Sequence, residues 1–145
     1  MLRLLCFVSV LSFGQMLPPK DVPGVADPAV TQANIHQTIC VANYTSTVRD
    51  VTEAEKKAVY ARDHATVSKG KCCEVDHLIS LEIGGANDIE NLWAQPYEPR
   101  PGAHEKDKLE NALHKDVCSG KITLAEAQKV ISTNWYKEYQ KRYGK

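Results

Sequence analysis

The sequence has no excess of charge of either sign, with 18 lysine and arginine residues against 18 aspartate and glutamate residues. A general nucleic-acid-binding protein normally carries a clear basic excess, so the composition counts against that class. A nuclease stays open, because a bound cation or a local basic patch can supply a positive field. The 145 residues contain no internal repeat and no low-complexity block, and suffice for one compact domain.

The sequence also has no hydrophobic run long enough to span a bilayer. Its first 14 residues instead have the parts of a secretory signal peptide: Arg3, an apolar run from Leu4 to Phe13, and small residues at the end of that run. A buried N-terminal helix is the alternative. We therefore expect a secreted or periplasmic protein whose mature form has no membrane segment. Loss of Arg3 with the signal leaves 17 basic against 18 acidic residues, a net charge of −1.

The sequence lacks a Cys-x-x-Cys pair, which disfavours a zinc site built from cysteines. One of the five cysteines, Cys6, lies in the signal segment, and four remain: Cys40, Cys72, Cys73 and Cys118. An even number in an exported chain predicts disulfides, with three possible connectivities. A bond between the adjacent Cys72 and Cys73 would strain the peptide between them, and these residues alone do not select one pairing.

Proline is concentrated in residues 15–30, which predicts an extended, loosely ordered arm. Residues 31–145 form the single predicted domain, in which residues 31–41 fit either a short helix or the start of a strand. Capping boxes at Thr52 and Thr123 mark two helix starts. Predicted strands cover 72–77 and 92–95, and predicted helices 52–64, 104–118 and 123–143. This pattern indicates an α+β fold with a mostly helical shell.

The chemistry is concentrated in Asp76-His77-Leu78-Ile79-Ser80-Leu81-Glu82-Ile83-Gly84-Gly85 and in the Asn91-Leu92-Trp93 step that follows. An acid and an imidazole stand side by side at the end of an apolar strand. Because successive strand residues face opposite sides, the acid can bind a metal ion while the imidazole handles a proton. Asn87, in an Asn-Asp pair, is interpreted as a turn residue.

The segment from Glu74 to about Leu113 resembles the HNH, or ββα-metal, endonuclease family. The rest of the chain, from Thr38 to the helix that contains Ala125–Gln128, is similar to small secreted bacterial members of that family. The resemblance implies two short antiparallel strands plus a helix, and hydrolysis of phosphodiester bonds that leaves 5′-phosphate and 3′-hydroxyl ends. It also implies a nucleic-acid substrate, with DNA favoured over RNA, and a monomeric enzyme. Mg²⁺ or Mn²⁺ is the expected cofactor, with Zn²⁺ or Ni²⁺ as alternatives.

Carried onto this sequence, the family motif makes His77 the general base and Asp76 a metal ligand. Asn91 is then the residue that fixes the loop and orients His77. His104, at the start of the following helix, is the expected second metal ligand, with Asp107 as the substitute if His104 faces away. Gly84 and Gly85 are expected to supply positive φ angles for the loop over the metal.

The resemblance also suggests a Cys40–Cys118 pair, with a crossed arrangement that joins each of these to Cys72 or Cys73 as the alternative. The alternative function is a non-catalytic secreted module that keeps the ββα scaffold to bind nucleic acid or another protein. The adjacent acid and base argue against this alternative, because a scaffold alone needs neither.

Overall fold

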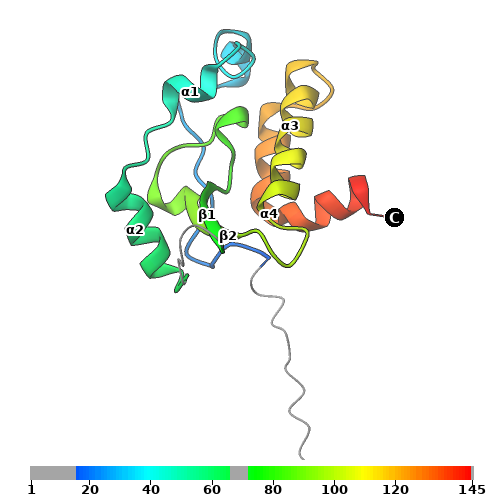
Figure 1. The fold of residues 1–145 in the computed structure, drawn as a ribbon. Helices are drawn as coiled ribbons and strands as arrows, with labels where there is room; N and C mark the ends of the chain where they lie inside the picture. Colours follow the sequence, from blue (N-terminus) through cyan, green and yellow to red (C-terminus); the bar gives the residue numbers. More distant parts are fainter. Residues whose placement is uncertain (1–15, 66–71, 145) are drawn as a thin grey trace, which may run out of the picture.

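A computed structural model describes residues 16–65 and 72–144. Within these residues the chain forms an α+β fold in which a two-stranded sheet lies among helices (Figure 1). The α-helices are α1 (Tyr44–Val48), α2 (Glu53–Arg62), α3 (Ala103–Cys118) and α4 (Leu124–Tyr143). Short 3-10 turns cover Gln32–Gln37, Leu81–Ile83 and Ile89–Asn91. The ambiguous segment after residue 30 is therefore helical.

The sheet consists of β1 (Cys73–His77) and β2 (Leu92–Pro96), which pair antiparallel. The register places Asp76 opposite Trp93 and His77 opposite Leu92, so the Asp-His pair lies at the end of β1 next to the start of β2. Helix α3 packs against β1, and α2 contacts both strands. The predicted strands are confirmed to within one residue at each end.

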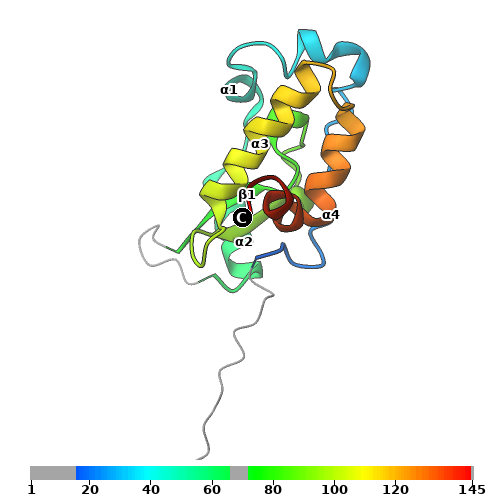
Figure 2. The same cartoon turned by 90° about the vertical axis from the view of Figure 1, so that its right-hand side faces the viewer.

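The predicted helices follow their local signals closely. The side chains of Thr52 and Thr123 accept hydrogen bonds from the backbone N–H groups of Glu55 and Glu126. The carboxylates of these glutamates accept in turn from the backbone N–H groups of Thr52 and Thr123, which completes two capping boxes. Apolar residues at helical spacing on α3 and α4, including Leu109, Leu113 and Ile131, then join the main core. Figure 2 shows these two helices side by side.

The N-terminal arm differs from its prediction. Residues 16–30 contain no helix or strand and turn at 20–21 and at 28–29, but they are packed against the domain: Val22 is 2% exposed and Val30 is 6% exposed. Ala26 forms an isolated bridge with Gly85, and the N–H of Gly24 donates to the carbonyl of Glu90. The arm is therefore packed into the domain and not loosely ordered, because Val22 and Val30 belong to its buried clusters.

Two disulfides join Cys40 to Cys118 and Cys72 to Cys73, so the crossed arrangement is wrong. The first links the segment after the 3-10 turn Gln32–Gln37 to the end of α3. Disulfides are typical of oxidising compartments, as expected for an exported protein. Among the described helices, none is both long and apolar enough to cross a bilayer. The predicted signal peptide lies outside the described residues.

Candidate active site

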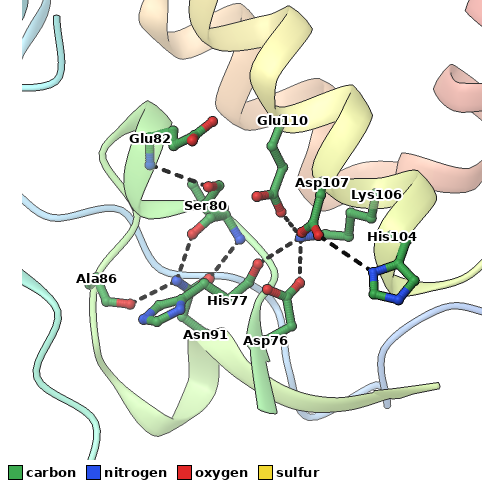
Figure 3. A network of polar contacts seen from close by, with 11 residues as sticks. Asp76, His77, Ser80, Glu82, Ala86, Asn91, His104, Lys106, Asp107 and Glu110 are labelled. Carbon is green, nitrogen blue, oxygen red and sulfur yellow. Dashed lines mark hydrogen bonds and ion pairs between the residues drawn. The ribbon is translucent and has the colours of Figure 1, made fainter. Parts of the chain in front are cut away.

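The end of β1 directs Asp76 and His77 to opposite sides, as the alternation of strand side chains requires. Asp76 faces α3, where its carboxylate meets the Lys106 ammonium (Figure 3). The His77 ring faces the loop that carries Asn87. The acid and the imidazole are therefore adjacent in sequence but have different neighbours.

Asn91 organises the loop between the strands. Its side chain is fully buried, and its Oδ1 accepts hydrogen bonds from the N–H groups of Val25 and Ile79, at 3.2 and 2.9 Å. Its Nδ2 donates to the carbonyls of Ile79 and Ala86, at 2.9 and 2.8 Å. All four hydrogen bonds go to backbone groups, so Asn91 ties the arm, the end of β1 and the glycine loop together without contacting the His77 ring.

The two glycines of the loop are required for different reasons. Gly84 has a φ of +74°, a left-handed conformation that L side chains rarely adopt. Gly85 has no positive φ, but a Cβ atom on it would lie 1.7 Å from the carbonyl oxygen of Ile79. The prediction of a positive φ therefore holds for Gly84 alone, and Gly85 is needed because the backbone passes so close.

The residue that orients His77 is Asn87. Its Nδ2 donates to the carbonyl of Val48 at 2.8 Å, and its Oδ1 accepts from the N–H of Asp50 at 3.3 Å, which fixes the direction of the amide. The same Oδ1 lies 3.0 Å from Nε2 of His77. Since that oxygen only accepts, Nε2 of the neutral ring must carry the proton. The lone pair then belongs to Nδ1, which is the atom able to accept a proton.

The surroundings keep this imidazole neutral. His77 is 3% exposed, and its burial lowers the pKa below the ordinary 6.5. The hydrogen bond to Asn87 and the charge of Asp76 oppose this shift, whereas the charges of Arg49 and Lys106 add to it. A histidine with a lowered pKa is unprotonated at neutral pH, as a general base must be.

Lys106 is the centre of the charged network in Figure 3. Its side chain is fully buried, and Nζ donates to Oδ2 of Asp76 at 2.7 Å, to the carbonyl of His77 at 2.8 Å, and to Glu110. An ammonium group has three donors, so each has one acceptor. Lys106 therefore fastens helix α3 to the end of β1 at the Asp-His pair.

The two acids bonded to Lys106 differ. The pKa of Glu110 is raised to about 8, because the effects of burial and of the Asp76 charge outweigh the opposing effect of Lys106. For Lys106, burial lowers the pKa, but the carboxylates of Asp76 and Glu110 outweigh burial and raise it. Lys106 is therefore charged at neutral pH and forms an ion pair with Asp76, whereas Glu110 is mostly protonated there.

His104 lies at the first turn of α3 but points away from the strand end. Its side chain is 66% exposed, its ring stacks on Tyr97 with 5.0 Å between ring centres, and Nδ1 is 4.0 Å from a carboxylate oxygen of Asp107. Burial raises the pKa of Asp107, and the charges of Asp76 and Glu74 raise it further. Asp107 therefore lies close enough to Asp76 and Glu74 for their charges to affect its pKa, whereas the His104 ring stacks on Tyr97.

Within residues 16–65 and 72–144, three potential metal ligands approach one another closely only at Cys40, His114 and Cys118. These residues form a possible Cys/His metal-binding group. The two sulfur atoms are bonded to each other in the disulfide, however, so neither is a thiolate ligand in this state. The His114 imidazole Nε2 lies 2.8 Å from the carbonyl oxygen of Ile39.

Two residues of the site were missed in the sequence. Asn87 was interpreted as a turn residue, and no local pattern distinguishes an amide that orients a histidine. Lys106 had a usable signal: counting back from Leu113 and Leu109 in steps of three and four reaches Glu110 and Lys106, which places a lysine on the buried stripe of α3.

Comparisons with known proteins identify no relative: no family model, no curated protein and no solved structure matches the chain. The resemblance to HNH endonucleases therefore rests on the motif residues quoted above.

Proposed function

We propose that this protein is a metal-dependent endonuclease of the HNH type, with His77 as the general base. The observation that supports it best is the hydrogen bond between Nε2 of His77 and Oδ1 of Asn87 at 3.0 Å. This bond leaves Nδ1 as the acceptor on a ring whose pKa is lowered.

In this proposal Nδ1 of His77 takes a proton from the water that attacks the phosphodiester. General base catalysis of this kind contributes roughly 10²–10⁴-fold to the rate. Asn87 holds the ring by its other nitrogen, and Asn91 holds the loop that carries Asn87 and the glycines. The positive charge of Arg49 is close enough to lower the pKa of His77, so this side chain is a candidate partner for the phosphate.

The carboxylates of Asp76 and Asp107 are hard oxygen donors of the kind that a divalent cation prefers, although within the described residues they do not gather with a third ligand as closely as Cys40, His114 and Cys118 do. Asp76 would hold the cation together with Asp107 or His104. When bound, Mg²⁺ or Mn²⁺ stabilises negative charge on the phosphate and the leaving oxygen. Lys106 takes one carboxylate oxygen of Asp76, which fixes the orientation of that ligand.

A non-catalytic binding module is the second candidate, and two observations favour it. Only 3% of His77 is exposed, and the Lys106 ammonium already pairs with the Asp76 carboxylate. A scaffold that keeps the strand end intact for stability would have both properties. Such a protein would bind its partner without any cleavage.

The decisive experiment is a plasmid-nicking assay on purified protein with Mg²⁺ or Mn²⁺, with EDTA, and with metal restored after EDTA. The endonuclease proposal expects nicking that EDTA abolishes and added metal restores. Asp76→Ala should lose both nicking and metal affinity in calorimetry. His104→Ala and Asp107→Ala are then compared, and the one that weakens metal binding by about 10–100-fold identifies the second ligand. Absence of nicking with every metal would leave the binding module as the function.

A further inference from the structure

Helix α4 is interrupted in the middle and carries a hollow on its outer side. Asn134 has φ −167° and ψ 85°, which is extended rather than helical backbone. Its Oδ1 accepts a hydrogen bond from the N–H of Lys137 at 2.8 Å, so Asn134 caps the second part of the helix. Figure 1 shows the red C-terminal part of α4 turning away from the first part.

A groove of about 430 Å³ lies at this bend. The residues that line it are Lys129, Val130, Thr133, Asn134, Lys137, Glu138 and Lys141. Lys129, Thr133, Lys137 and Lys141 are spaced by four residues, while Leu124, Ala127, Ile131 and Trp135 pack into the core. The core side of α4 thus buries the apolar residues, and the groove gathers lysines from both parts of the helix.

The groove has a positive charge that its own acid does not cancel. Glu138 accepts from Arg142 at 2.6 Å, and Lys141 is only a distant partner at 3.9 Å, with its side chain 78% exposed. Neither Lys129 nor Lys137 forms an ion pair within the part of the chain that the structure describes. The Glu138 charge is thus taken up by Arg142, and the three lysines remain available.

We propose that this groove on α4 binds the phosphodiester backbone of nucleic acid. The inference rests on the proposed function, which supplies the substrate. Charge complementarity selects the occupant: phosphates repeat along a strand, and lysines spaced along a helix can neutralise several of them. The lysine stems with Val130 and Thr133 give the groove walls on which the sugars can lie. This local patch supplies a positive field although the whole chain has no basic excess.

The test is fluorescence anisotropy with labelled single-stranded and duplex DNA in EDTA, so that no cleavage occurs. The variant Lys129→Ala/Lys137→Ala/Lys141→Ala is compared with the control Lys20→Ala/Lys57→Ala/Lys115→Ala, which removes the same charge from exposed positions elsewhere. We expect about 10–100-fold weaker binding for the groove variant only. The slope of log K against log salt should fall by about 2 for single strands. Circular dichroism checks that both variants are folded.

Equal DNA binding by the two variants would overturn the proposal that the groove binds nucleic acid, and so would absence of DNA binding by the wild type. Displacement of DNA by polyglutamate as efficient as by unlabelled DNA would assign the groove to acidic proteins instead. Failure of the proposed function is distinguishable, because a protein that binds DNA through the groove but never nicks it keeps the groove and loses the enzyme. If the wild type nicks DNA normally and the groove variant binds and nicks as well as the wild type, the enzyme proposal stands and the groove proposal is wrong.

Discussion

The substitution Lys106→Met tests the buried charge network most directly. Methionine retains the apolar stem but removes the ammonium that donates to Asp76, Glu110 and the carbonyl of His77. All three acceptors then lose their donor in a site where Lys106 has no exposed surface and Glu110 is 8% exposed. Removing one partner of a buried ion pair costs about 3–5 kcal/mol, because the remaining charge is left without compensation. This is a large share of the roughly 5–15 kcal/mol that stabilises a typical domain.

The measurement is urea unfolding at neutral pH with the disulfides intact. The control Lys115→Met removes an exposed lysine from the same helix and should change the free energy of unfolding by no more than about 0.5 kcal/mol. The double variant Lys106→Met/Glu110→Leu should recover part of the loss, since one uncompensated acid becomes apolar. A loss below about 1 kcal/mol for Lys106→Met would show that the Lys106 ammonium does not stabilise the fold through the buried acids.

Three further outcomes follow from single contacts. Because the folded pKa of Glu110 is raised to about 8, its contribution to stability is present below the unfolded pKa of roughly 4.3 and is lost as pH rises. Urea unfolding should therefore show the wild type losing stability relative to Glu110→Gln from about pH 5 to pH 8, and parallel curves would contradict this. The Cys40–Cys118 bond closes a separation of 78 residues, so Cys40→Ser/Cys118→Ser should cost about 4 kcal/mol in the same assay. A cost near zero would count against a structural role. Asn87→Ala should lower kcat for nicking by about 10–100-fold with little change in KM, because Nε2 of His77 loses its acceptor; an unchanged kcat would remove Asn87 from the mechanism.

Elements with local signals were predictable from the sequence. Thr52 and Thr123 start helices through hydrogen bonds to residues three positions on, so the chemistry that sets these ends is visible in a four-residue window. The two short strands flank a glycine loop that marks a turn, and this local signal also made them predictable. The helix ends and the sheet could therefore be predicted from the sequence.

Features that depend on distant contacts were not predictable. The arm is buried because Val22 and Val30 pack against residues far along the chain, and its composition alone indicates only an extended backbone. Lys106 is buried although lysine is almost always exposed unless it is paired, and its main partner, Asp76, is 30 residues away. His104 was the expected second metal ligand at the start of α3, but its ring stacks on Tyr97 and its side chain is 66% exposed.

The central claim is that His77 acts as the base of a nuclease, and cleavage by His77→Ala tests it most directly. If His77 is the general base, wild-type protein with Mg²⁺ or Mn²⁺ should nick plasmid DNA, and purified His77→Ala should not nick it above background. Metal binding by calorimetry should remain close to that of the wild type, because His77 is not a ligand, and circular dichroism should show a folded protein. Nicking by His77→Ala at the wild-type rate would contradict the account.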